Sequence, residues 1–350
     1  MDRQQKLLGG LYGSALGDAM GAATETRSLE LIKETFGGRV TEILTPPMDC
    51  YAAGSKAGEV TDDFSMAYMT LKAIINHGGE INQNVVEEAL LDWSSYPQYA
   101  KCAGPTTRVT IARLKGEETP VSKYDTNLCI NSKASNGAGM KMGPIGLLTP
   151  GDLDAAVDNA VVIGMVTHNN TVALSAAAAI SAAAAAAMVD GACVSDVLRA
   201  GLYGAEEGFE RTLPFARPVA SPSVARKMEV AIEIGLRYQN DFEKAMREIE
   251  DIIGTGLPSN EAIPAVFGMI AACKGDTMET IYMGVNAGDD TDTVACMAGS
   301  IVGALNGVDS IPAHHRELID KMNPFDLKKA AKDMDALITE GKVQHARRYF

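Results

Sequence analysis

The chain has 350 residues, enough to bury a sizeable core, and this length allows either one large domain or two. Its 45 aspartates and glutamates outnumber its 31 lysines and arginines, and the net charge is -14. This acidic balance excludes the basic surface that nucleic acids require and argues against an anionic membrane as a partner. The N-terminal MDRQQK has no apolar signal core, and none of the 6 cysteines belongs to a CxxC pair. We therefore expect a protein of the reducing cytoplasm.

Apolar residues recur at spacings of three and four in most segments, a pattern that predicts amphipathic helices. Proline or glycine marks most of the junctions between these segments. The best candidate for a short strand is residues 39–44. In chain order, the segments that most clearly predict helices are residues 64–76, 84–93, 223–238, 242–253 and 292–305.

Residues 172–189 are rich in alanine and carry no charge, so their length alone would permit a membrane span. Alanine is a weak membrane former but the best helix former, and Ser175 and Ser181 interrupt the run. Small side chains on every face let neighbouring helices approach closely, so we expect a buried helix at the centre of a large helical bundle. Because no low-complexity linker divides the chain, the sequence predicts a single, mainly α domain over residues 1–350.

Two short acidic clusters lie far apart in the chain: Thr61-Asp62-Asp63 and residues 289–293, which read Asp-Asp-Thr-Asp-Thr. Each cluster opens a segment with helical spacing. Two unit charges about 4 Å apart repel by about 1 kcal/mol in water and by about 4 kcal/mol at a partly buried position. Convergence of the two clusters without a cation would therefore be costly. Carboxylates and hydroxyls with no nearby cysteine or histidine favour a hard ion, Mg2+ or Mn2+.

Three other interpretations of these clusters are weaker. An aspartate at a helix N-cap stabilises the helix by about 1 kcal/mol, which explains one carboxylate per helix but not several together. Asp290 and Asp292 also fit the DxDx[TV] motif of the haloacid dehalogenase phosphatases, but that motif normally follows a strand near the N-terminus of an α/β fold. A calcium loop counted from Asp290 fails, because Ala295 stands where glycine is needed and Ile301 where glutamate is needed.

Four motifs of the chain resemble those of the ADP-ribosylglycohydrolase family, the group typified by the dinitrogenase-reductase-activating glycohydrolase. They are similar to the family's "G…GDAxG…E" opening, its TDD motif, its NGxxMR…P.G loop and its GGDxDT…AG…GA signature. They follow one another in the family's order over nearly the whole chain. The matching segments are residues 9–25, 60–63, 135–146 and 286–304.

The resemblance implies an all-α fold, a compact orthogonal helical bundle with at most minor strand content, and an enzyme that hydrolyses a glycosyl bond. It also implies two divalent cations, Mg2+ or Mn2+, that bind the substrate ribose and activate water. Carried over to this chain, the catalytic residues are Glu25, Asp63 and Asp292, and Asp289 is expected just outside the ligand set. The expected metal ligands are Thr61, Asp62, Asp63, Asp290, Asp292 and Thr293.

The glycine-rich loop of residues 135–146 is the expected contact for the diphosphate side of an ADP-ribosyl group. Its glycines let backbone N–H groups approach an anion closely. His168 occupies the position of a family Thr-His motif before the alanine-rich segment. A plain turn and a locally bonded histidine are the alternatives that need no function. The expected substrate-binding residues are Ser135, Asn136, Gly137, Gly139, Lys141 and His168.

Departures from the family pattern leave the substrate open. Phe64 stands where the family often has threonine, Lys141 replaces the commoner arginine, and Asp289 replaces a glycine. None of these changes removes an expected metal ligand. The leading hypothesis is hydrolysis of the ribosyl C1 bond in an ADP-ribosylated protein or an ADP-ribosyl derivative. The alternatives are a glycohydrolase acting on a small ribosyl compound, such as a nucleoside, and a non-catalytic, crystallin-like member of the family.

Overall fold

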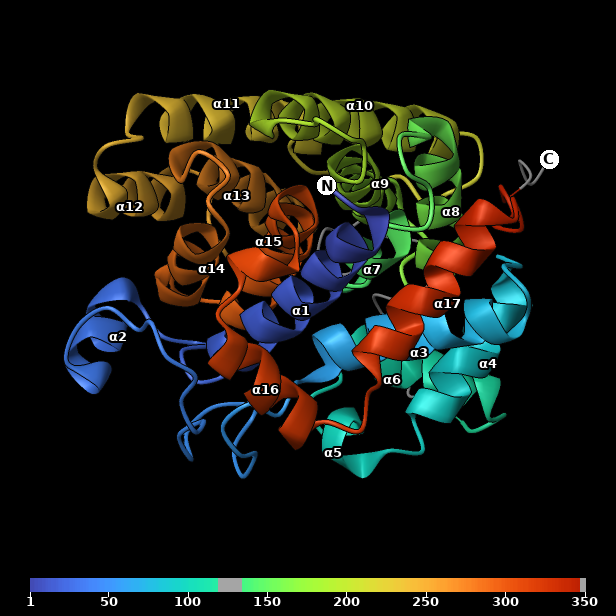
Figure 1. Ribbon diagram of the computed structural model, residues 1–350, viewed down its shortest axis with the longest axis horizontal. Coiled ribbons are helices and arrows are strands. Elements are labelled where there is room, and N and C mark those ends of the chain that lie inside the picture. Colours follow the sequence, from blue (N-terminus) through green and yellow to red (C-terminus); the bar gives the residue numbers. More distant parts are fainter. Residues whose placement is uncertain (119–133, 347–350) are drawn as a thin grey trace.

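The computed structural model describes residues 1–118 and 134–346, and Cys129 lies outside these ranges (Figure 1). Within them every regular element is a helix, and the β-type pairings are two isolated bridges, Ser135 with Pro258 and Asn170 with Arg217. The predicted all-α fold is confirmed. The α-helices are α1 (Arg3–Gly21), α2 (Leu29–Phe36), α3 (Asp62–Asn76), α4 (Gln83–Trp93), α5 (Pro97–Ala100), α6 (Pro105–Leu114), α7 (Met142–Gly146), α8 (Leu153–Met165), α9 (Thr171–Ala187), α10 (Val194–Thr212), α11 (Val224–Arg237), α12 (Phe242–Ile252), α13 (Ser259–Ala272), α14 (Thr277–Asn286), α15 (Thr291–Asn306), α16 (Ala313–Met322) and α17 (Leu327–Thr339), and the short 3-10 helices are η2 (Asn136–Ala138) and η3 (Val308–Ser310).

The six segments expected to be helical all form helices, and their ends fall close to the predicted ones. The strand expected at residues 39–44 is wrong. The N–H of Val40 donates to the side-chain oxygen of Asn286 in α14, and the side-chain amide of Asn286 donates back to the Val40 carbonyl, both at 2.8 Å. Because one helix side chain satisfies both backbone groups of Val40, this segment needs no neighbouring strand.

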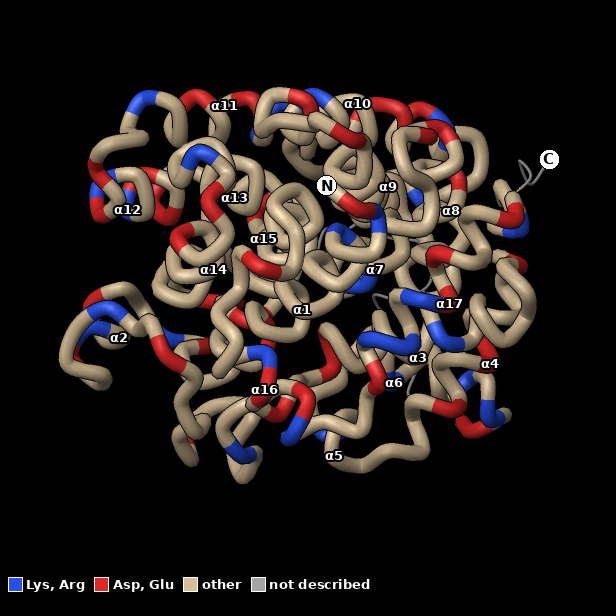
Figure 2. Tube along the Cα trace, viewed as in Figure 1, with Lys and Arg blue, Asp and Glu red and all other residues tan. Residues whose placement is uncertain are grey.

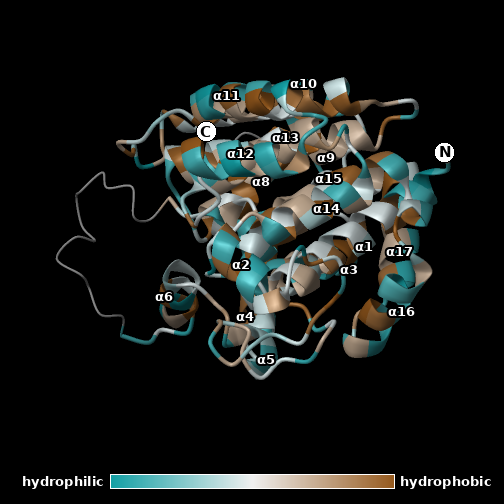
Figure 3. Cartoon of the chain, turned by 90° about the vertical axis from the view of Figure 1, so that its left-hand side faces the viewer, coloured by the Kyte–Doolittle hydropathy of each residue, from teal (hydrophilic) through white to brown (hydrophobic). Residues whose placement is uncertain are grey.

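The helices are arranged in layers (Figures 1 and 3). α10 and α11 form one outer layer, and α9 and α13 pack directly beneath them. α1, α14 and α15 come next, and α3, α4, α16 and α17 lie on the side of α1 that faces away from α10 and α11. The largest buried side chains, among them Trp93, Phe64 and Phe267, are distributed through these layers.

α9 is the buried centre of the bundle, as its alanine-rich sequence predicts. The side chain of its N-cap residue, Asn170, accepts a hydrogen bond from the first turn (2.9 Å), and no residue of the helix is charged, so its tube is tan in Figure 2. Ser175 donates to a carbonyl of α10 (2.7 Å) and Ser181 to a carbonyl of α8 (2.9 Å), so both buried hydroxyls have partners. Across the described ranges, no helix combines the length and the apolar character that a membrane span requires.

Glycines let α1 and α15 pack backbone against backbone. A Cβ atom added to Gly13 would lie 2.1 Å from the carbonyl oxygen of Gly299, and one added to Gly9 would lie 2.0 Å from that of Gly303. A side chain at these positions would force the helices apart. A Cβ atom added to Gly21 would lie 2.4 Å from the Cα atom of Asp292. This close contact places the C-terminal end of α1 beside the N-terminal end of α15.

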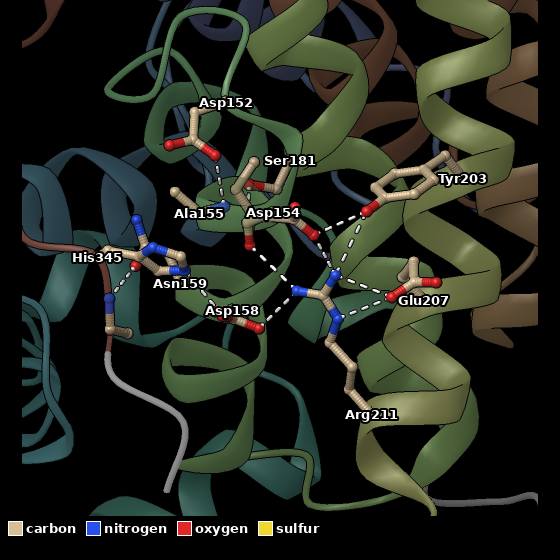
Figure 4. A network of polar contacts seen from close by, with 12 residues as sticks. Asp152, Asp154, Ala155, Asp158, Asn159, Ser181, Tyr203, Glu207, Arg211 and His345 are labelled. Carbon is tan, nitrogen blue, oxygen red and sulfur yellow. Dashed lines mark hydrogen bonds and ion pairs between the residues drawn. The ribbon is translucent and has the colours of Figure 1, made fainter.

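A network of ion pairs joins α10 to α8 and to the C-terminal segment (Figure 4). Arg211 in the last turn of α10 binds Asp154 and Asp158 of α8 and Glu207 one turn back. His345 contacts the other oxygen of Asp158 at 2.8 Å. The side chains of Arg211 and Asp158 are 14% and 10% exposed, so this pair is largely shielded from solvent and salt. The network fastens the segment around His345 to the bundle.

Candidate functional site

The first acidic cluster lies at the start of α3. Thr61 is the N-cap residue, and its hydroxyl oxygen accepts a hydrogen bond from the N–H of Asp63 (3.3 Å). The buried carboxylate of Asp18 in α1 accepts from the N–H groups of Thr61 and Phe64, at 2.8 Å each. Asp18 and Thr61 thus accept the hydrogen bonds of three backbone N–H groups at this helix end, so the carboxylate of Asp63 is not needed as its cap.

The second acidic cluster lies at the start of α15. Asp290 holds the N-cap position but makes no side-chain bond to the helix, and its carboxylate accepts from the side-chain amide of Asn136 instead (2.7 Å). Asp289 has a φ of 57°, and its backbone is hydrogen-bonded to the loop after α1, from its N–H to the Arg27 carbonyl (2.9 Å) and from the Thr26 N–H to its own carbonyl (2.7 Å). Helix capping therefore does not explain Asp289 or Asp290, whereas Asp292 accepts a hydrogen bond from the N–H of Thr293 in the first turn (2.9 Å).

The two clusters meet in space. The Thr293 hydroxyl donates to one oxygen of Asp63 (2.9 Å). The Thr61 hydroxyl lies 3.2 Å from the other oxygen of Asp63 and 3.5 Å from an oxygen of Asp292. Two sets of three carboxylates have oxygens within 4.8 Å of one another: Asp18, Asp63 and Asp292, and Glu25, Asp290 and Asp292.

Burial and mutual repulsion oppose ionisation of four carboxyl groups of the site, those of Glu25, Asp62, Asp63 and Asp292. Burial, and to a smaller extent repulsion from neighbouring carboxylates, raises the pKa of Asp62 to about 7 and that of Glu25 to about 9. The same two causes raise the pKa values of Asp63 and Asp292 well above their usual range. A divalent cation would offset both costs, because it attracts the charge that burial and repulsion disfavour. The donor set of carboxylate and hydroxyl oxygens therefore fits Mg2+ or Mn2+.

A cavity of about 420 Å³ opens beside the carboxylates, a volume typical of small-molecule sites. The N-terminal half of α6 forms part of its wall and contributes Arg108, and Leu257 and Pro258 form another part. Neither Thr61, Gly139 nor Lys141 is among the described residues that line it. The other site residues expected from the sequence line the cavity: Glu25, Asp62, Asp63, Ser135, Asn136, Gly137, His168, Asp290, Asp292 and Thr293.

His168 lines the cavity, whereas Lys141 is not among the lining residues, and each is only 2% exposed. Burial lowers the pKa of Lys141 to about 8. Burial and the nearby charge of Lys141 lower the pKa of His168 to about 3. The Nε2 atom of His168 lies 2.8 Å from the hydroxyl of Ser135. Gly137 packs against the same ring, since a Cβ atom there would lie 2.9 Å from Cε1 of His168.

Asp18 and Arg108 are charged residues of the site to which the sequence analysis assigns no role. Asp18 is fully buried and shapes the start of α3, and its signal in the sequence is its place as the aspartate of the GDAxG motif. Arg108 lines the cavity, and its positive charge acts to lower the pKa of Asp62, although burial and repulsion outweigh it. No pattern in the sequence marks Arg108, because only the folded chain brings α6 to the acidic clusters.

The fold and the site define an all-helical protein with a carboxylate-rich, oxygen-donor centre beside a small-molecule cavity. The chain matches the ADP-ribosylglycohydrolase family over residues 1–346 and therefore belongs to that family. A solved structure of an ADP-ribosylglycohydrolase-related protein complex shares the fold with a TM-score of 0.63 and 22% identity, over 96% of this chain and 99% of that chain.

Relatives of several kinds are similar to the chain. The uncharacterized protein YegU of Escherichia coli is 28% identical over 94% of this chain and 96% of its own length. ADP-ribosyl-[dinitrogen reductase] glycohydrolase of Rhodospirillum rubrum is 25% identical over 95% of each chain. ADP-ribosylarginine hydrolase Tri1 of Pseudomonas putida is 25% identical over 94% of this chain and 80% of its own length. These similar identities show the family but do not single out the dinitrogenase-reductase-activating type.

Proposed function

We propose that this chain is a metal-dependent glycohydrolase that cleaves the ribosyl C1 bond of an ADP-ribosylated protein or an ADP-ribosyl derivative. The observation that carries the proposal is the convergence of both acidic clusters and Glu25 beside one cavity. Membership of the ADP-ribosylglycohydrolase family supports the choice of reaction. The names of two relatives, one specifying ADP-ribosylarginine and one an ADP-ribosyl group on dinitrogen reductase, support the choice of substrate class.

Two divalent cations, Mg2+ or Mn2+, are the proposed cofactors. Asp289, which stands where the family has a glycine, stays outside the proposed ligand set. When bound, the cations would orient the ribose hydroxyls, make a bound water more acidic and stabilise charge that develops near the anomeric carbon. The residues that would hold them are Thr61, Asp62, Asp63, Asp290, Asp292 and Thr293, with Asp62 included because it lines the cavity beside Asp63.

The protein groups nearest the reaction are three carboxyl groups. Glu25 lines the cavity, and its carboxyl oxygen lies within 4.8 Å of oxygens of Asp290 and Asp292. From there it can exchange a proton with the substrate or hold the ribose in place. Asp63 and Asp292 face the cavity from opposite clusters, and we assign to them the orientation of the attacking water.

The wall around His168 would bind the rest of the substrate. Ser135, Asn136 and Gly137 present hydroxyl, amide and unhindered backbone groups along one side of the cavity. The side-chain amide of Asn136 also donates to the carboxylate of Asp290, so a hydrogen bond joins this loop to the acidic centre.

The chain as a whole, residues 1–350, would act as one domain.

The direct test is a product assay by mass spectrometry with Mg2+ or Mn2+ present. ADP-ribosyl-arginine, ADP-ribosyl-serine and a panel of nucleosides are compared as substrates. We expect free ADP-ribose from at least one ADP-ribosyl compound, and a loss of at least about tenfold in Asp62→Ala. Asp152→Asn is the matched control, because this exposed carboxylate caps α8 and asparagine caps equally well.

The outcomes of this assay separate the alternatives. Release of base from nucleosides alone would select the small-substrate glycohydrolase. No release from any compound, by protein that still binds metal, would contradict an enzymatic role and favour a non-catalytic member.

A further inference from the structure

A chain of hydrogen bonds runs from a buried lysine to the cavity. The ammonium of Lys141 donates to the hydroxyl oxygen of Thr167 (3.2 Å), which lies 2.8 Å from Nδ1 of His168. On the other side of the ring, Nε2 lies 2.8 Å from the hydroxyl oxygen of Ser135. Lys141 and His168 are each 2% exposed, and Ser135 lines the cavity. The chain thus connects the start of α7 to the substrate side of the site.

Lysine sets the direction of these bonds. An ammonium group has donors and no acceptor, so the Thr167 oxygen must accept from Lys141. The hydroxyl proton of Thr167 then needs an acceptor of its own. Among the residues that the structure describes, the acceptor within reach is Nδ1 of His168.

The tautomer of His168 follows from this direction. A ring buried this deeply beside a positive charge is neutral, so it carries one proton and one lone pair. With Nδ1 accepting from Thr167, the ring proton is on Nε2 and is donated to Ser135. The Ser135 hydroxyl proton has no acceptor among the described protein groups. It is left for an acceptor in the cavity that Ser135 lines.

We propose that Lys141 is a positioning residue that makes Ser135 an obligate hydrogen-bond donor, so that the substrate must present an acceptor oxygen, of the kind a phosphoryl group carries, at this wall. The assignment rests on the proposed function and adds to it the chemistry of recognition. Lys141 does not itself line the cavity. Its positive charge polarises the hydrogen bonds from Thr167 through His168 to Ser135, so that the Ser135 hydroxyl favours an anionic acceptor. A substrate with only N–H donors at this point would face Ser135 donor to donor and be rejected.

The first test reads the tautomer without substrate or metal. Long-range 1H–15N spectra of protein labelled in histidine, with the His168 signals assigned by their loss in His168→Gln, report which ring nitrogen carries the proton. We expect the proton on Nε2 in the wild type and a mixture of tautomers in Thr167→Val, which keeps the shape of the side chain but removes the hydroxyl. A proton on Nδ1 in the wild type would overturn the assignment.

The second test reads recognition with ADP-ribose and ribose as probes in calorimetry. Lys141→Met should weaken ADP-ribose binding about tenfold, with ribose binding unchanged, and Lys141→Arg should restore it because a guanidinium is also donor-only. Lys6→Met is the matched control, a lysine of 3% exposure whose ammonium bonds the Ala187 carbonyl away from the cavity. If Lys141→Met folds poorly, Thr167→Val serves as the second variant.

The outcomes distinguish this assignment from the proposed function. Equal affinity for ADP-ribose in wild type, Lys141→Met and Thr167→Val would overturn the role of Lys141 while leaving the glycohydrolase proposal standing. A wild type that binds no ADP-ribose would overturn both the proposed substrate class and the acceptor at Ser135. The tautomer would still decide separately whether Lys141 directs the ring.

Discussion

The hydroxyl of Thr293 donates to the carboxylate of Asp63 at 2.9 Å, across 230 residues of sequence. This single bond joins the start of α15 to the start of α3 and makes the two acidic clusters one centre. The glycine contacts between α1 and α15 bring Asp18 and Glu25 to the same place. Carboxylates gathered this closely are costly without a cation, and the first two predictions follow from that cost.

Metal should stabilise the protein at this centre. We expect Mg2+ or Mn2+, but not NaCl of equal ionic strength, to raise the melting temperature of metal-stripped protein by several degrees, since a ligand that binds only the folded state stabilises it. The increase should vanish in Asp62→Ala and in Asp290→Ala and persist in Asp152→Asn. Differential scanning calorimetry measures all four proteins. An equal response to NaCl would contradict a specific metal site.

The metal-free protein should lose stability as the pH rises. Burial and repulsion raise the pKa of Asp62 to about 7 and that of Glu25 to about 9, whereas the unfolded chain has ordinary values of about 4. The folded state therefore binds these protons more tightly, and their stabilisation is complete below about pH 4 and is lost as the pH rises through 7 to 9.

Calorimetry of metal-free protein between pH 5.5 and 9 measures this loss. We expect the melting temperature to fall by a few degrees over this range, less steeply in Asp62→Asn, and Mg2+ to restore it at the upper end. Slopes that are identical in the wild type and in Asp62→Asn would count against the raised pKa of Asp62.

Close packing of α1 on α15 makes Gly13 intolerant of a side chain. Gly13→Ala would place a Cβ atom 2.1 Å from the carbonyl oxygen of Gly299, and we expect a loss of about 3 kcal/mol in the free energy of unfolding. Gly104→Ala is the control, because no atom of the described residues lies within 4 Å of the added Cβ and the cost should stay within about 1 kcal/mol. Urea unfolding compares the two, and equal losses would argue against this helix contact.

Arg211 should matter more than an exposed arginine of the same helix. Arg211→Leu removes the arginine that pairs with Asp158, whose side chain is only 10% exposed. We therefore expect the free energy of unfolding to fall by about 3 kcal/mol. Arg199→Leu breaks a pair whose side chains are 73% and 40% exposed and should cost no more than about 1 kcal/mol. The same urea experiment decides between these values. A loss in Arg211→Leu as small as that in Arg199→Leu would show that the network is not stabilising.

Local patterns in the sequence are sufficient to predict six of the described α-helices. Helical spacing of apolar residues predicts α3, α4, α11, α12 and α15, and the alanine run predicts a buried α9, because these patterns depend on which face of a helix is covered. Residues 39–44 also have the composition of a strand, but the side chain of Asn286 satisfies Val40 and no strand forms. That outcome depends on a tertiary contact that no local pattern reveals.

The acidic centre was predicted in part because its residues cluster in sequence. Such clusters predict Asp62 and Asp290 as ligands, whereas Asp18 stands alone in α1 and, although it is the aspartate of the GDAxG motif, is not assigned a role. A signal for the approach of α1 was present, since Gly9, Gly13 and Gly21 fall on one face of the helix. No comparable sequence pattern predicts the cavity wall at Arg108, because this wall forms only when distant helices pack together.

The central claim is that the two acidic clusters hold a pair of divalent cations, and anomalous diffraction from crystals grown with Mn2+ tests it most directly. We predict two manganese peaks between Asp62 and Asp63 on one side and Asp290 and Asp292 on the other, both absent in crystals of Asp290→Ala. No peak at this position in the wild type, with manganese bound elsewhere or nowhere, would contradict the claim.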